Sequence, residues 1–339
     1  MALTNPNAVK TLVGWNQAVW ITDGSLVRKV LRVTDYNMGS KQTGDAPDYV
    51  TGRQDRTAWT KGPIEIDGTL TYPLTFETSG QTFNGLNMFL FGAKLADDIQ
   101  GTFGIESTAG EVVAGCKVQS TTISCNAGEP IQCNSTVWGI STQTNTSSGN
   151  PTPFLASDAG GSVAKTGLVL GENVDGVFTT VQVPMWDACY VQGAPDGMLV
   201  VGWSITIDNQ LKRNYTMGDQ NINGSVYGSP WGLNATSISA GQRRVTGTLT
   251  WQSDSEGVLN YILGSGIDGL TISIRTDSGD FDFIMTMANC LWNASPPRLA
   301  TGDRVTVESS FTALGTGNID FDAITFTGSG YSDPPFQNV

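Results

Sequence analysis

Two stretches of this chain decide its fold, because they carry the same pattern: Gly62-Pro-Ile-Glu-Ile-Asp-Gly68-Thr-Leu-Thr-Tyr72 and Gly241-Gln-Arg-Arg-Val-Thr-Gly247-Thr-Leu-Thr-Trp251. Both contain Gly-Thr-Leu-Thr followed by an aromatic residue. Threonine, valine, isoleucine and aromatic residues fit the pleated surface of a strand. The shared pattern therefore predicts two corresponding strands in two copies of one unit.

Three further pairs of stretches occur in the same order and at a nearly constant separation. They are 15–27 with 186–200, 86–92 with 259–264, and 128–140 with 302–314. Ordered self-similarity of this kind indicates an internal duplication. The alternative is that two similar β-meanders recur only because the composition is biased toward strand and turn residues.

Each copy is expected to open with an apolar strand and an Asp-Gly turn, at 23–24 and at 196–197. A second strand follows at 26–34 or 199–207, and the Gly-Thr-Leu-Thr strand comes next. Apolar residues at helical spacing then predict a short helix that ends at Gly92 or Gly264. Polar and apolar residues alternate at 204–208, 280–284 and 304–308, which predicts strands with one face on a core and one on solvent or a lumen.

The fold class predicted from these elements is mainly β, with two tandem β-sandwich or barrel domains that each carry one short helix. The expected divisions are an N-terminal arm at 1–12, a first domain at 13–182, a second domain at 183–327 and a C-terminal arm at 328–339. A polar insertion is expected at about 141–161, rich in Ser, Thr, Asn and Gly. Further insertions at 32–59 and 214–240 are predicted to be loops that contact a neighbour or decorate the surface.

The charge balance argues against tight binding to nucleic acid. There are 18 basic and 31 acidic residues, which gives a net charge of -13. Affinity for a polyanion depends on Lys and Arg. A chain of this charge repels DNA within a screening length of about 8 Å at physiological salt.

Catalytic signatures are missing from the sequence, so we expect no enzyme activity, no cofactor and no bound metal. The chain has no histidine, the commonest general base and metal ligand. Phosphate-binding, nucleophile-elbow and zinc-protease motifs are absent. The five cysteines show no CxxC spacing and are read as small buried residues, with one or two disulfides as the alternative. We expect neither a signal peptide nor a membrane span.

Three stretches carry a resemblance to a known family: Gly115-Cys-Lys-Val-Gln-Ser-Thr-Thr-Ile-Ser-Cys-Asn-Ala-Gly-Glu-Pro-Ile131, Val201-Gly-Trp-Ser-Ile-Thr-Ile-Asp-Asn-Gln-Leu-Lys-Arg-Asn-Tyr215 and Ile238-Ser-Ala-Gly-Gln-Arg-Arg-Val-Thr-Gly-Thr-Leu-Thr250. Over about 15–326 the chain resembles bacteriophage tail tube proteins. These motifs are patterns of strands and turns and include no catalytic signature.

The resemblance implies a structural subunit of the virion tail. Strands from each subunit would join into one inner barrel, and stacked rings would form the conduit for genome ejection. With two tandem domains, three copies would complete a pseudo-hexameric ring. It also implies a tape measure protein in the lumen, other tail proteins at the ends, DNA passing without specific binding, no membrane, assembly in the host cytoplasm and a siphophage-type tail.

Acidic strand residues are the candidate lining of the lumen, because a negative wall would let DNA slide without sticking. The six candidates are Glu65, Asp67, Asp208, Asp280, Asp282 and Glu308. For each of them alone, an outer solvated strand face remains the alternative.

Two other functions stay open at this level. One is a different virion β-protein, such as a decoration or baseplate subunit. The other is a carbohydrate-binding β-sandwich, because the nine tryptophans could line a sugar site. Core or interface packing is the competing use of those tryptophans.

Overall fold

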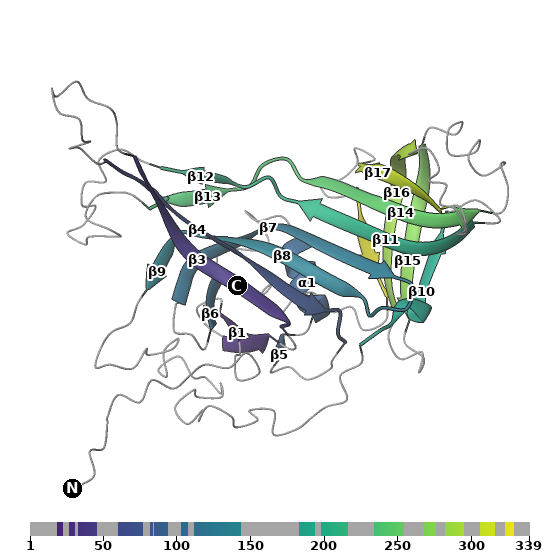
Figure 1. Cartoon of the computed structure of the whole chain (residues 1–339), viewed down its shortest axis with the longest axis horizontal. Coiled ribbons are helices and arrows are strands. Elements are labelled where there is room, and N and C mark those ends of the chain that lie inside the picture. The colour runs from purple at the N-terminus through teal and green to yellow at the C-terminus, as the bar shows by residue number, and fades with distance from the viewer. Residues whose placement is uncertain are drawn as a thin grey trace, which may run out of the picture.

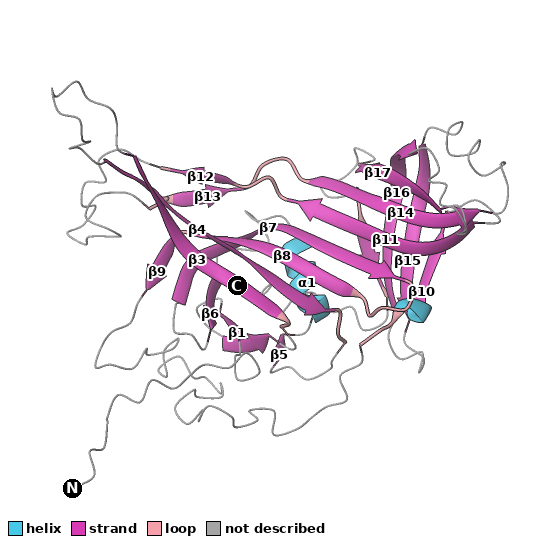
Figure 2. Ribbon diagram, viewed as in Figure 1, coloured by secondary structure: helices cyan, strands magenta, loops and turns pink. Residues whose placement is uncertain are grey.

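A computed structural model shows a protein made mainly of β-strands, which confirms the mainly β part of the predicted fold class (Figures 1 and 2). The structure describes residues 19–22, 27–30, 33–45, 60–76, 82–83, 85–93, 103–107, 112–143, 183–193, 198–215, 234–253, 267–275, 282–294, 306–315 and 323–328.

The first half of the chain contains nine strands and one α-helix among these residues. They are β1 (Val19–Thr22), β2 (Val27–Val30), β3 (Asp35–Asp45), β4 (Thr60–Pro73), β5 (Thr82–Phe83), α1 (Gly85–Ala93), β6 (Phe103–Ser107), β7 (Val112–Asn126), β8 (Gln132–Gly139) and β9 (Ser141–Gln143). Six of the strands pair antiparallel in the order β3-β4-β8-β7-β6-β1. Strand β2 adds to β1, and β5 pairs parallel with β2.

The second half repeats this order of pairing. Its elements are a short 3-10 helix (Trp186–Ala188), β10 (Cys189–Gln192), β11 (Met198–Asp208), β12 (Lys212–Asn214), β13 (Ser237–Ser239), β14 (Arg244–Ser253), β15 (Ile267–Arg275), β16 (Asp282–Ala294), β17 (Thr306–Leu314) and β18 (Thr325–Thr327). Six strands pair antiparallel in the order β11-β14-β17-β16-β15-β10. Strand for strand, β3 corresponds to β11, β4 to β14, β8 to β17 and β7 to β16.

The correspondence extends to register and to buried hydrogen bonds. Met38 lies opposite Gly68 as Ile205 lies opposite Gly247, so the two Gly-Thr-Leu-Thr motifs occupy matching positions. Inside the first half the hydroxyl groups of Tyr72 and Ser135 are 2.8 Å apart. Inside the second half, the Trp251 indole donates to Ser309 Oγ at 3.1 Å. The aromatic residue after each motif thus bonds to a buried serine of the next strand in the sheet.

The two halves are joined through β7 and β11. The first part of β7 pairs with β6 and β9, and its later part pairs with β8 on one side and β11 on the other. The β7–β11 register runs from Asn126 opposite Gly202 to Ser120 opposite Asp208. One continuous sheet therefore crosses from the first half into the second, as Figure 1 shows.

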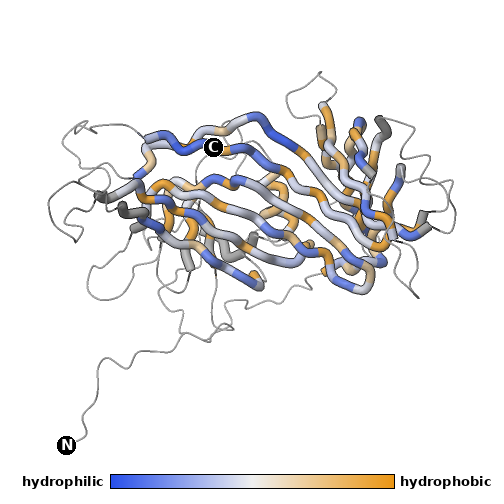
Figure 3. The backbone as a smooth tube through the Cα atoms, turned by 45° about the horizontal axis from the view of Figure 1, so that its top comes forward, coloured by the Kyte–Doolittle hydropathy of each residue, from blue (hydrophilic) through white to orange (hydrophobic). Residues whose placement is uncertain are grey.

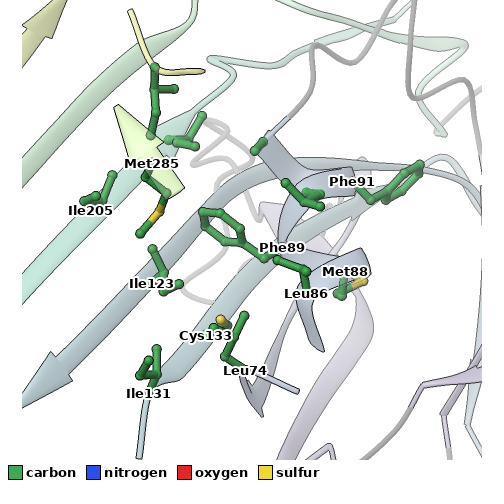
Figure 4. Packing of buried hydrophobic residues seen from close by; sticks show 14 of the residues in the cluster. Leu74, Leu86, Met88, Phe89, Phe91, Ile123, Ile131, Cys133, Ile205 and Met285 are labelled. Atoms are coloured by element: carbon green, nitrogen blue, oxygen red, sulfur yellow. The ribbon is translucent and has the colours of Figure 1, made fainter. Parts of the chain in front are cut away.

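A large hydrophobic core lies behind this sheet and is shared by both halves. Helix α1 consists mainly of apolar residues, and Leu86, Met88, Phe89, Leu90 and Phe91 are buried, as expected for a helix without a broad polar face. Its Phe89 packs edge-on against Phe283 and Phe326, at centroid distances of 6.3 and 6.0 Å. Figure 4 shows Phe89 between the helix and Met285 of β16. Helix α1, which belongs to the first half, therefore packs against strands β16 and β18 of the second half.

Several element predictions hold and two are wrong, the insertion at 32–59 and the matching of 26–34 with 199–207. The matching is wrong because the strand that corresponds to β11 is β3. The helix predicted to end at Gly92 is α1, and the strand predicted at 199–207 is β11. The insertion predicted at 32–59 contains the 11-residue strand β3. Strand β3 lies beside β4 and contributes only Tyr36 and Met38 to the packing against the core, so its sequence needs few apolar residues. The insertion predicted at 214–240 begins and ends with the strands of the β12–β13 hairpin.

Other predictions fall outside the described residues. These are the helix at 259–264, both Asp-Gly turns, the arm at 1–12, all but the first residue of the arm at 328–339, and most of the insertion at 141–161. All five cysteines are free, and Cys116, Cys125, Cys133 and Cys290 are buried, as predicted. Within the described part of the chain, none of the helices has the length and apolar character needed to cross a membrane.

Candidate functional site on the polar face of the sheet

The face of the sheet opposite the core is lined by small polar side chains. Buried and more exposed residues alternate along β4, β8, β7, β11, β14 and β17, so each strand presents every second residue to this face. Figure 3 shows the alternation of apolar and polar residues. We call this surface the polar face. Because β7 and β11 belong to one sheet, the polar face is continuous over both halves.

Two rows of directly opposed residues cross the polar face. The first row is Thr71, Asn134, Thr122, Thr206, Thr246 and Thr312. The second is Gln132, Ser124, Ser204, Thr248 and Ser310. Every member of both rows is uncharged, so the middle of the polar face is a belt of hydroxyl and amide groups.

Hydrogen bonds link neighbours within these rows. The hydroxyl groups of Thr122 and Thr206 are 2.8 Å apart, and so are those of Ser204 and Thr248. The Thr122–Thr206 contact joins β7 to β11, so the belt does not break where the halves meet. In the second half the polar face is hollowed by about 330 Å³ over Ser204, Thr246, Thr248 and Ser310.

Charged residues lie at the ends of the strands. At one end, Lys41 donates to Asp67 at 3.1 Å, and Glu65 lies on the same face of β4. The Arg213 guanidinium lies 4.0 Å from Glu65 and 3.8 Å from Asp67. Both predicted lumen residues of β4 thus face basic partners, which offset much of their negative charge.

Arg213 holds the β12–β13 hairpin of the second half onto the first half. Its Nη2 donates to the Ile66 carbonyl at 2.7 Å, and its guanidinium lies 4.2 Å from the centroid of the Trp138 ring. Leu211 and Ile238 of the hairpin region are buried with Trp138 and Ile140. A planar cation suits this place, because it bonds to oxygen atoms in its plane and stacks on an aromatic face.

Asp208 lies where β11 leaves the sheet toward this hairpin. Its carboxylate accepts hydrogen bonds from Gln119 Nε2 at 3.0 Å and from the backbone N–H of Gln210 at 2.8 Å. Arg244 lies directly opposite it on β14. Gln210 has a positive φ of 46°, and the short bond to Asp208 favours this tight turn. Asp208 is therefore a turn-forming residue at the edge of the polar face.

Asn209 and Arg243 join the second half to helix α1. The Asn209 amide donates to the carbonyls of Gly92 at 3.0 Å and Val118 at 2.9 Å. Arg243 Nη1 donates to the Ala93 carbonyl at 2.9 Å, and burial lowers the pKa of this guanidinium. Carbonyl groups at a helix C-terminus lack partners within the helix. The second half supplies those partners.

The remaining acidic candidates are dispersed. Glu308 is exposed on the polar face, at the opposite end of the strands from Glu65 and Asp67. Asp282 lies 3.4 Å from Arg275, at the far end of β16 from the residues that pair with β17. Asp280 lies outside the described residues. The structure brings Glu65 and Asp67 together, and it sets Asp208 at the same end of the sheet.

Arg213 and Asn209 were not foreseen as functional residues. A single arginine in a segment rich in Gly, Asn and Ser gives no periodic signal. Its carboxylate and carbonyl partners on β4 precede it by well over a hundred residues. Asn209 follows a strand directly and has the sequence of an ordinary turn. The one available signal was the position of both residues in 201–215, one of the three stretches that carry the family resemblance.

Burial makes three of the core thiols poor nucleophiles. Burial raises the pKa of the Cys116 and Cys133 thiols, and it raises the pKa of Cys290 to about 11. Since the thiolate is the reactive form, these groups are inert near neutral pH.

A family model described as phage tail tube protein matches residues 7–323, nearly the whole chain. The comparison with curated proteins returned no match.

Proposed function

Because the chain belongs to the phage tail tube protein family and is a structural subunit of a phage tail tube, we propose that three copies close into a pseudo-sixfold ring. In this proposal 13–182 and 183–327 are two tandem tube domains. Stacked rings form the conduit through which the genome is ejected. The repeated order of strand pairing in the two halves supports the tandem arrangement.

The observation that carries the proposal is the pairing of β7 with β11 inside the chain. Strand β16 corresponds to β7, and β3 corresponds to β11. Among the described residues, β3 pairs with β4 alone, and Trp292 to Ala294 of β16 pair only with β17. Strand β16 of one subunit therefore offers its edge to β3 of the next, as β7 does to β11. Joining the edges removes a site of uncontrolled strand pairing.

In this ring the polar face forms the wall of the lumen. Its belt of hydroxyl and amide groups has no positive charge to hold phosphates, and the chain as a whole is acidic. DNA then passes without specific binding, and before ejection a tape measure protein occupies the same space. In this ring the belt is flanked by acidic residues, which line the lumen only at the two ends of the strands. They are Glu65, Asp67, Asp208 and Glu308.

The surroundings of the subunit follow from the same proposal. Rings assemble in the host cytoplasm and end in the virion tail, with other tail proteins at the two ends of the tube. A tube of tandem domains suits a long siphophage tail. Its family assigns the subunit a structural role, and catalysis has no part in this proposal.

The mass of the assembled ring tests the stoichiometry. We expect native mass spectrometry of purified protein to give particles of three chains, and electron microscopy to show rings with apparent sixfold symmetry. Six chains in a ring, or a protein that stays monomeric under all assembly conditions, would contradict the proposal.

A further inference from the structure

The β12–β13 hairpin shows how one half of the chain covers the end of the other. It buries Leu211 and Ile238 against Trp138 and Ile140, and Arg213 reaches the acidic pair on β4. In the same place Lys117 of β7, directly opposite Trp138, is only 6% exposed. This contact within the chain shows what kind of hairpin could cover the corresponding end of the second half.

The corresponding end of the second half is uncovered. Leu291 and Thr312 are opposed on β16 and β17 as Lys117 and Trp138 are on β7 and β8. Leu314 follows Thr312 by two residues, as Ile140 follows Trp138. Leu291 is 45% exposed and Leu314 is 38% exposed. Two large apolar side chains thus lie open where the first half is covered.

The β3–β4 hairpin is the counterpart of the hairpin that covers the first half. Asp45 lies opposite Thr60 on this hairpin, and Lys212 lies opposite Ser239 on the β12–β13 hairpin. Both pairs are equally distant from the shared glycines, Gly68 and Gly247. The β3–β4 hairpin therefore reaches as far from its glycine as the β12–β13 hairpin does.

Charges at matching positions of the two halves are inverted. Lys41 lies opposite Glu65 in the first half, and Asp208 lies opposite Arg244 in the second. The two hairpins also carry opposite charges at one matching position, where the β3–β4 hairpin has Asp45 and the β12–β13 hairpin has Lys212. Inside the chain, the basic hairpin meets an acidic sheet end. The uncovered sheet end carries Arg244, and the hairpin left to cover it carries Asp45 on β3 and Lys61 on β4.

We propose that the sheet end formed by Arg244, Leu291, Thr312 and Leu314 is the docking surface for the β3–β4 hairpin of a second copy of this chain. This inference rests on the proposed ring. The β12–β13 hairpin fits the sheet end of a first half, and the β3–β4 hairpin fits the sheet end of a second half. Exchanging the two hairpins would bring like charges together, Asp45 with Glu65 and Lys212 with Arg244. Rings are thereby restricted to alternating halves.

The apolar part of the surface is tested with Leu314→Glu and a matched control. The control is Leu199→Glu, which also replaces an exposed leucine, 52% exposed on β11. We expect Leu314→Glu to raise the protein concentration needed for ring formation by at least about tenfold, with the melting temperature of the monomer unchanged. Leu199→Glu should leave the mass of the ring unchanged. Equal behaviour of the two variants would overturn the docking surface.

The charge inversion is tested by exchange. Asp45→Lys and Arg244→Glu should each weaken ring assembly by about tenfold, and the double variant should recover it. Wild-type and double-variant chains with different tags should form separate rings when mixed. Failure of the double variant to recover, while its circular dichroism matches the wild type, would sink the charge part.

Failure of the ring itself is a separate result. If the wild-type chain never forms three-chain rings, the proposed function fails before any variant is compared. If wild-type rings form and neither Leu314→Glu nor Arg244→Glu affects them, only the docking surface is refuted.

Discussion

At the scale of single residues, Asn209 is the side chain on which the contact between the halves depends most directly. It is fully buried, and its amide satisfies the Gly92 and Val118 carbonyls. Asn209→Ala leaves both carbonyls without this donor. We expect it to lower the free energy of unfolding by about 1–3 kcal/mol, measured by urea denaturation.

A surface amide provides the control for Asn209. Asn134 is exposed on the polar face and donates to Thr71 Oγ1 at 3.2 Å. Asn134→Ala should change stability by less than about 0.5 kcal/mol. If the two alanine variants lost the same stability, Asn209 would not have the role described.

Tyr72 makes stability depend on alkaline pH. Burial, with a smaller contribution from nearby Cys133, raises its pKa well above the ordinary value of 10.0, although hydrogen bonds to Ser135 and Thr121 partly oppose this. Above pH 10 the unfolded chain releases this proton and the folded chain keeps it. Stability therefore falls as pH rises through this window, by about 1.4 kcal/mol per pH unit for this group.

Tyr72→Phe removes the titrating hydroxyl and should flatten this dependence in urea denaturation between pH 10 and pH 11. Tyr190→Phe is the control, because the Tyr190 ring is 59% exposed. The wild-type slope should persist in the control. An unchanged slope in Tyr72→Phe would contradict the account.

The sequence predicts some of these residues and misses others for a physical reason. Glu65 and Asp67 are two apart on one strand, so the period of the strand places them on one face. The partner that balances them, Arg213, bonds to the neighbouring Ile66 carbonyl across 147 residues of sequence. No local pattern encodes a contact of that range.

At the scale of elements, the glycine of the Gly-Thr-Leu-Thr strand allows close packing. A Cβ at Gly247 would overlap the Phe311 ring and the Ser204 carbonyl. Gly247→Ala should destabilise the folded chain by about 1–3 kcal/mol, measured by urea denaturation.

Gly39→Ala is the matched control on strand β3. A Cβ at Gly39 would meet no atom within 4 Å. We expect its effect to stay within about 0.5 kcal/mol of the wild type. A tolerated Gly247→Ala would show that Phe311 repacks at little cost.

Elements with strong local patterns were predicted well, and weakly patterned ones were not. Helix α1 and strands β4, β11 and β14 follow from apolar spacing and the repeated motif. Strand β3 was mistaken for a loop because Asp35 to Asp45 has only two apolar residues that pack on the core. Pairing with β4 holds β3 in the sheet, although the sequence of β3 has no strong strand pattern of its own.

At the scale of the whole molecule, the uncharged belt of the polar face predicts how the tube treats DNA. Thr206→Lys with Thr248→Lys places two positive charges per chain on this belt. We expect assembled tubes of this variant to retain short duplex DNA, with an affinity that falls steeply with salt. The wild type should retain none, as judged by electrophoretic mobility.

Thr325→Lys with Thr327→Lys is the control, since both threonines are exposed on β18, a strand that pairs with β16 and is not one of the six that form the polar face. It adds the same charge and should not retain DNA inside the tube. Equal retention by both variants would mean that the polar face does not line the lumen.

The sequence indicated the family and the repeated blocks, but it left a decoration or baseplate protein and a sugar-binding sandwich open. The match over residues 7–323 identifies the tail tube family. Three of the tryptophans considered for sugar binding are used in packing: Trp203 and Trp251 are buried, and Trp292 packs on Phe311. The β7–β11 pairing was beyond prediction, because it depends on which edges the fold leaves open.

The β7–β11 pairing also has a consequence for the kinetics of assembly. In a ring built as proposed, every second joint already exists within a folded chain and forms at any dilution. Only the alternate joints require an encounter between molecules. Linking two binding units replaces a bimolecular step by an intramolecular one. Ring nucleation should therefore follow a lower power of protein concentration than for the same ring made of separate single-domain chains.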